Sequence, residues 1–175
     1  MKQSKHKQAE NLIVSISKGD SQALGVLYEL IKTDVYAYSL SKLRNKADAE
    51  DITEETFVKI YKYSSYYKPC GKPLAWVFTI ASNLIKRHYE VSSRSVGLEI
   101  IENKSGTSFE DSVCNNAFLQ QVLSLLTQEE SEIISLRLVS GLKHREIAKL
   151  INKPLSYVLS KYNRAVKKLK KEVDL

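Results

Sequence analysis

The feature that most constrains the fold is a pair of amphipathic helices near the C-terminus, separated by a short break at Asn152, Lys153 and Pro154. Apolar residues recur every three or four positions on both sides of the break, which is the spacing of helices with one buried face. Asn152 can adopt the left-handed conformation that a tight turn needs, and Pro154 suits the entry to the next helix. The run 143–171 contains ten Lys or Arg residues and one acid, Glu146. This combination is typical of a helix-turn-helix that binds duplex DNA.

The rest of the chain also predicts helices. It contains only six Gly and three Pro, no strand-like alternation and no internal repeat. The predicted fold class is therefore all-α, with two small helical modules joined by a flexible polar linker. The predicted boundaries are 9–90 for the first module, 91–112 for the linker and 113–173 for the second module, which contains the helix-turn-helix.

Two helix starts can be predicted from short motifs. Asp48 is expected to cap the third helix, after Asn45 has closed the one before it. Thr127 and Glu130 have the spacing of a capping box, so another helix is expected to begin there.

Composition favours a polyanionic partner. The net charge is +7 and the pI is about 9.3. The two cysteines, Cys70 and Cys114, are far apart, and the three histidines are scattered, so no metal site or cofactor is predicted. Free thiols and the absence of a signal core or membrane-length apolar run indicate a cytoplasmic protein with no membrane insertion.

The third helix is strongly acidic. The four candidates for binding a basic partner are Asp48, Asp51, Glu54 and Glu55. The helix dipole favours acids at the start of a helix, and it explains these four only in part. A surface that docks onto a basic partner explains them all, although a solvated acidic face is the alternative reading.

The fourth helix and the loop before it combine aromatic, amide and cationic groups, which suit unstacked bases. The candidates are Tyr66, Tyr67, Asn83, Lys86 and Arg87. Trp76 is instead expected in the core. On the second helix of the basic pair, the candidates for binding duplex DNA that are expected to point outward are Ser156, Tyr157, Ser160, Lys161 and Arg164. Lys168 is a further candidate on the same helix. No catalytic constellation or phosphate-binding glycine loop is present, so the protein is not expected to be an enzyme.

Three segments, in this order, resemble bacterial sigma factors of the extracytoplasmic-function group within the sigma-70 family: DAEDITEETF, WVFTIASNLIKRHY and REIAKLINKPLSYVLSKYNRAVKKL. The resemblance extends from about residue 9 to 171. The chain departs from the family pattern at Glu54, where glutamine is usual, and at Arg87 and Glu90, where aspartate and arginine are usual. It also has Tyr157 and Lys161 where threonine and arginine are common.

The resemblance implies a function in transcription initiation. The acidic helix would bind core RNA polymerase through Asp51, Glu54 and Glu55, on a basic coiled coil of the largest subunit. The fourth helix and its preceding loop would capture bases of the melted minus-ten element, with Asn83 as the best single candidate. The C-terminal module would bind the minus-35 element as duplex. The expected partners are core polymerase and promoter DNA, and the resemblance leaves room for an anti-sigma factor.

Two other functions fit parts of the sequence. A transcription regulator could use the helix-turn-helix without polymerase, which would leave the acidic helix unexplained. A helical adaptor could use its basic tail to bind an acidic protein or lipid, and sequence-selective DNA binding would exclude it.

Overall fold

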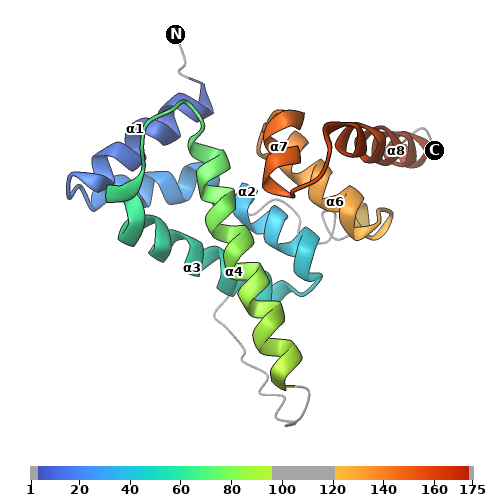
Figure 1. The fold of residues 1–175 in the computed structure, drawn as a ribbon, viewed down its shortest axis with the longest axis horizontal. Coiled ribbons are helices and arrows are strands. Elements are labelled where there is room, and N and C mark those ends of the chain that lie inside the picture. The colour runs from blue at the N-terminus through green and yellow to red at the C-terminus, as the bar shows by residue number, and fades with distance from the viewer. Residues whose placement is uncertain (1–3, 96–120, 174–175) are drawn as a thin grey trace.

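The computed structural model describes residues 4–95 and 121–173, and these ranges contain helices and no strand (Figure 1). The N-terminal elements are α1 (Lys5–Ser17), α2 (Gln22–Leu43), α3 (Lys46–Tyr63), the 3-10 helix η1 (Ser64–Tyr66) and α4 (Pro73–Ser95). The C-terminal elements are α6 (Gln128–Ile134), the π-helical turn η2 (Ser135–Val139), α7 (His144–Leu150) and α8 (Leu155–Val173). The all-α prediction is confirmed.

Local motifs set several helix ends. The capping box at α6 is confirmed, because the Thr127 hydroxyl accepts from Glu130 N at 3.3 Å and the Glu130 carboxylate accepts from Thr127 N at 2.9 Å. The predicted cap of α3 is wrong: Asn45 fills that place, and its side-chain oxygen accepts from Asp48 N at 3.1 Å. An asparagine is as good a cap as an aspartate, so the helix begins at the earlier of the two residues.

Helix α2 is the centre of the N-terminal module. Its second half is buried from Asp34 to Ser41 without interruption, which is expected only for a helix covered on all sides. The Tyr38 ring packs edge-on against Phe78 of α4, with centroids 5.3 Å apart. Helices α1, α3 and α4 surround α2 on the other sides.

Helices α7 and α8 form the predicted helix-turn-helix. Ile147 and Val158 are fully buried at its centre. Asn152 lies in the turn at φ 53°, which confirms its predicted left-handed conformation. Ala165 packs against Leu126, and this contact joins α8 to the segment before α6.

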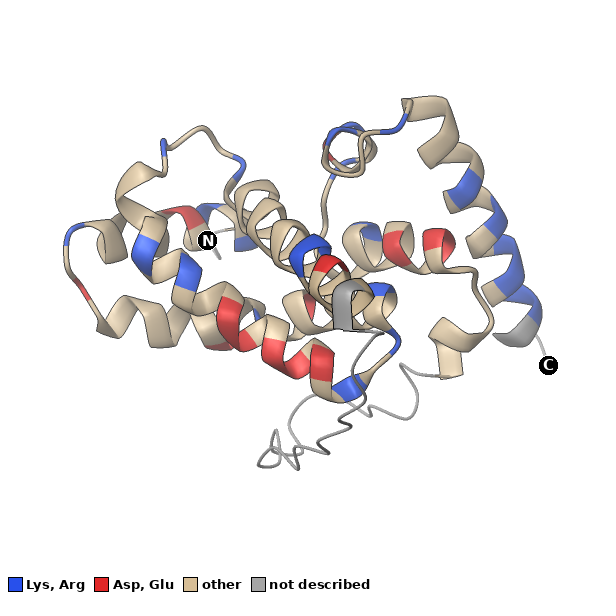
Figure 2. Cartoon of the chain, turned by 60° about the horizontal axis from the view of Figure 1, so that its bottom comes forward, with Lys and Arg blue, Asp and Glu red and all other residues tan. Residues whose placement is uncertain are grey.

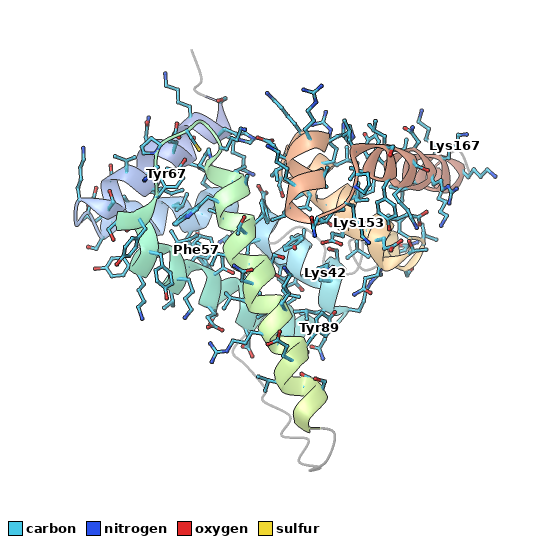
Figure 3. All side chains as sticks on the ribbon, viewed as in Figure 1. Lys42, Phe57, Tyr67, Tyr89, Lys153 and Lys167 are labelled. Atoms are coloured by element: carbon cyan, nitrogen blue, oxygen red, sulfur yellow. The ribbon has the colours of Figure 1, made fainter. Side chains whose placement is uncertain are left out.

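The two modules pack against each other. Arg44, at the end of α2, donates to the carbonyls of Leu123 and Leu126 and to the Ser131 hydroxyl, the last at 2.7 Å. Lys42 forms an ion pair with Glu132 of α6 at 3.0 Å. Figure 3 shows Lys42 where α2 meets the C-terminal helices. Buried apolar side chains continue from one module into the other, so the described residues share a core.

The predicted linker begins too early. Helix α4 continues through Ser95, so 91–95 is helical and not part of a linker. The remainder of the predicted linker, up to 112, lies outside the described residues. The second predicted module, 113–173, is described from 121 to 173, and its first described residues, 121–124, are helical.

Within the described ranges, no helix has both the length and the apolar character needed to cross a bilayer.

Candidate nucleic-acid and protein interfaces

The acidic surface consists of Asp48, Asp51, Glu54 and Glu55 on α3. Asp51, Glu54 and Glu55 are exposed and Asp48 is half-buried, whereas Ile52 and other residues on the opposite face enter the core. Figure 2 shows acidic residues following one another along α3. Since none of the three exposed carboxylates is needed for packing, the surface is available to a basic partner.

A groove of about 330 Å³ runs between the acidic surface and α4. Its lining residues are Asp48, Asp51, Ile52, Glu55, Leu84, Arg87, His88 and Val91. His88 lies 3.5 Å from the Asp48 carboxylate. Arg87 therefore borders the acidic surface, although the sequence placed it among the DNA-binding candidates.

Asn83, Lys86 and Arg87 are exposed on one side of α4. Successive residues of an α-helix are rotated by about 100°, so Asn83 lies between the directions of Lys86 and Arg87. Lys86 lines a cavity of about 350 Å³ that faces the C-terminal module. The Asn83 amide thus lies between two cationic side chains. This arrangement suits a nucleotide whose base edge bonds to the amide and whose neighbouring phosphates contact the cations.

The two tyrosines of the loop differ in accessibility. Tyr66, at the end of η1, is 78% exposed and presents an open ring. Tyr67 is buried, its ring lies 5.0 Å from that of Trp76, and its hydroxyl donates to Glu10 at 2.8 Å. The predicted stacking role for Tyr67 is not supported, because stacking a base would require the ring to leave this site. Trp76 packs against the core as expected, although it stays partly exposed.

Tyr66 and Asn83 are not adjacent. Asn83 is ten residues beyond Pro73, the start of α4, which corresponds to about 15 Å of helix. The structure therefore brings Asn83, Lys86 and Arg87 together on α4, whereas Tyr66 belongs to η1, on the other side of the intervening loop.

The outward side of α8 is polar and basic. The exposed residues opposite the buried Val158 are Ser156, Ser160, Asn163, Arg164, Lys167 and Lys171. Figure 2 shows basic residues along the length of α8. Asn163, Lys167 and Lys171 were missing from the predicted set, and the four-residue step from Ser156 through Ser160 could have identified this side.

Three predicted DNA-binding residues face α6 and not the outward side. Lys161 pairs with Glu129 at 2.5 Å, and Lys168 pairs with the buried Glu130 at 2.7 Å. The ammonium groups of Lys153 and Lys161 lie 5.6 Å and 5.5 Å from the centroid of the Tyr157 ring. The outward orientation predicted for Tyr157 and Lys161 is therefore wrong, because the acids of α6 attract this flank of α8.

These contacts change the ionisation of the groups involved. The bonds from Lys161 and then Tyr157 hold the pKa of Glu129 below its usual value. Burial, together with Glu129, raises the pKa of Tyr157 to about 12. Burial would raise the pKa of Glu130, but the bonds from Lys168 and Thr127 outweigh it, so the pKa is lowered. Both acids stay ionised at neutral pH and partly neutralise α8.

Comparison with known proteins matches both modules. The family described as "Sigma-70 region 2" matches residues 27–95, and "Sigma-70, region 4" matches residues 119–169. The ECF RNA polymerase sigma factor BldN of Streptomyces coelicolor is 32% identical over 167 residues, which are 90% of this chain and 63% of that protein. SigW of Bacillus subtilis, another ECF sigma factor, is 26% identical over 92% of this chain and 94% of that protein.

The fold is also found among solved structures. The sigma factor RpoE of Bartonella quintana, crystallised with the anti-sigma factor NepR, has a TM-score of 0.63 and 21% identity, over 85% of this chain and 94% of that one. Region 2 matches most of the N-terminal module, and region 4 matches the segment that contains α7 and most of α8. The chain therefore belongs to the sigma-70 family, in its extracytoplasmic-function (ECF) group.

Proposed function

We propose that this chain binds core RNA polymerase through the acidic surface of α3 and thereby directs the enzyme to promoters. The observation that carries the proposal is the exposure of Asp51, Glu54 and Glu55 on a helix whose other face is fully engaged in the core. A basic coiled coil of the polymerase would be electrostatically complementary to this surface. Core polymerase acts in the cytoplasm, which is where the protein would work.

The minus-ten element would be captured, once melted, by α4 and the loop before it. Asn83 would contact a base edge, because its amide offers both a donor and an acceptor. Lys86 and Arg87 would bind the backbone on either side, and Tyr66 would stack on an unpaired base. Tyr67 is assigned a supporting role in the loop.

The minus-35 element would be bound as duplex by the outward side of α8. Ser156 and Ser160 are short enough to reach base edges, and Arg164 can donate two parallel bonds to guanine or to a phosphate. Lys167, which is exposed on the same side, would contact phosphate.

An anti-sigma factor is proposed as a further partner. The relative RpoE was crystallised with NepR, and this chain shares its fold. Such a partner would have to cover α3 or α8 to keep the polymerase or the promoter away.

The function is tested by mixing the purified chain with core polymerase. We expect the two to elute together in gel filtration, and the complex to transcribe from specific sites in fragmented genomic DNA of the source organism, whereas core enzyme alone should not. Sequence-selective DNA binding without a polymerase complex would instead support a plain transcription regulator. If neither polymerase binding nor sequence-selective DNA binding is detected, the result would support a helical adaptor.

Alanine substitution of Lys167 should lower the slope of log affinity against log salt by about one unit for the minus-35 duplex, because one exposed phosphate contact is lost. The matched substitution Lys161→Ala should change the slope by clearly less, since Glu129 already neutralises that ammonium group. Binding of each variant to the same duplex at several salt concentrations measures the two slopes. Equal slopes for both variants would show that the ion pair with Glu129 does not persist on DNA.

A further inference from the structure

A single carboxylate of α1 holds the loop that leads into α4. Oε1 of Glu10 accepts three hydrogen bonds, from the Tyr67 hydroxyl at 2.8 Å, from Cys70 N at 3.0 Å and from Gly71 N at 2.8 Å. All three donors belong to the segment 67–72, which joins η1 to α4. Figure 3 shows Tyr67 where this segment passes α1.

Docking of α1 does not require this carboxylate. Ala9 and Ile13 are fully buried and Ile16 is nearly so, which gives α1 an apolar face of its own. Glu10 lies beside that face, and all three of its bonds go to the loop. The hydrogen bonds of Glu10 therefore stabilise the conformation of the loop more than they stabilise the packing of α1.

The loop needs such an acceptor. Its backbone–backbone hydrogen bonds lie at its two ends, from Tyr67 N to Ser64 O and from Trp76 N to Lys72 O, and Gly71 adopts a left-handed conformation at φ 72°. Hydrogen bonds to an ionised acceptor are about twice as strong as bonds between neutral groups. The bond from Gly71 N, followed by that from Tyr67, lowers the pKa of Glu10, so the acceptor stays ionised at neutral pH.

The conformation of the loop also affects Tyr66, the residue directly before it. Tyr67 is fixed on two sides, by the hydroxyl bond to Glu10 and by its ring contact with Trp76 at 5.0 Å. Tyr66 precedes this fixed residue, is 78% exposed and has a ring neighbour in Tyr63, with centroids 6.4 Å apart. Because so little of its ring is packed, its position depends on the backbone of the adjoining loop.

We propose that Glu10 is a positioning residue that sets the shape of the loop 67–72, and with it the place of Tyr66 against unpaired bases of the minus-ten element. This inference rests on the proposed function of the loop. It assigns to α1, a helix that belongs neither to the acidic surface nor to the helix-turn-helix, a part in the choice of promoter bases.

The first experiment tests the contact itself. Amide hydrogen exchange of Cys70 and Gly71 is measured by NMR in the full chain, in Glu10→Ala, in Glu10→Gln and in Glu29→Ala. Glu29 is an exposed acid of α2 that pairs with Lys32 and does not contact the loop in the described part of the chain, so its variant matches the charge change. Exchange at both amides should accelerate in Glu10→Ala, less in Glu10→Gln, which keeps an acceptor oxygen, and not in Glu29→Ala. Unchanged exchange in Glu10→Ala would overturn the inference.

The second experiment tests the consequence for DNA. Complexes of core polymerase with each variant are bound to promoter fragments whose minus-ten bases are unpaired and systematically substituted. In Glu10→Ala, which removes all three hydrogen bonds to the loop, discrimination between the best and worst base should fall by about tenfold. Glu10→Gln should recover part of it, and affinity for core polymerase should not change.

Two further variants separate this inference from the proposed function. Tyr66→Ala and Asn83→Ala alter the proposed base contacts directly. If either reduces discrimination while Glu10→Ala does not, the positioning role is wrong and the minus-ten assignment stands. If none of the three variants affects discrimination, the assignment of the loop and α4 to the minus-ten element fails, and the role of Glu10 fails with it.

Discussion

Replacing Glu54 and Glu55 with lysine is expected to abolish binding to core RNA polymerase while α3 stays folded. Both carboxylates are exposed and neither packs against the core, so the double variant should cost little stability, about 0.5 kcal/mol per exposed site. On a basic partner, however, each lysine replaces an attraction by a repulsion, and like charges across an interface cost several kcal/mol. The loss of affinity should therefore greatly exceed the loss of stability.

A pull-down with core polymerase measures binding, and circular dichroism checks that helicity is unchanged. The variant Glu54→Gln with Glu55→Gln removes the charges without reversing them and should bind with intermediate affinity. Glu90→Lys reverses an exposed acid of α4 outside the groove and should bind normally. Undiminished binding of the lysine double variant would refute the assignment of the acidic surface.

Preventing the two modules from separating is expected to cause the second large effect, a loss of promoter affinity. Lys86 of α4 and Tyr157 of α8 line the same cavity in the packed arrangement. Elements centred near positions minus 10 and minus 35 are separated by roughly 25 base pairs, or about 85 Å of B-DNA. The binding surfaces of the packed modules cannot span that distance, so the modules must separate when the promoter is bound.

A reducible crosslink tests this requirement. Gln128 donates to the carbonyl of Lys42 across the module boundary, so Lys42→Cys and Gln128→Cys place two thiols near each other. The native cysteines are first changed by Cys70→Ser and Cys114→Ser. The pair is then joined by a bismaleimide with a disulfide in its spacer. Simultaneous binding of two sites gains about 10²–10⁴ over either alone, so the crosslinked factor should lose at least about 100-fold in promoter affinity.

Reduction of the spacer should restore promoter binding, which shows that the substitutions themselves are harmless. The two single-cysteine proteins, treated with the same reagent, control for modification of the thiols. Normal transcription from a promoter with both elements by the crosslinked factor would mean that the packed modules can bind both elements.

The sequence determined the features that depend on neighbouring residues. The capping box of Thr127 and Glu130, the left-handed turn at Asn152 and the burial of Ile147 and Val158 were all predictable, because caps, turns and helical faces are set by residues within four positions of one another. The acidic row on α3 was predictable for the same reason, since its members lie within two turns.

Only the tertiary structure decided which of these groups meet. Glu10 and Gly71 lie 61 positions apart and Arg44 and Leu126 lie 82 apart, and no local pattern links such pairs. The pairing of Lys161 with Glu129 could not be predicted either. Helical periodicity predicts which side of α8 is buried, but it does not predict which charges the facing helix carries. The packing of α6 against α8, and of α6 against α2, decided that one flank of the basic helix is neutralised and the other remains open to DNA.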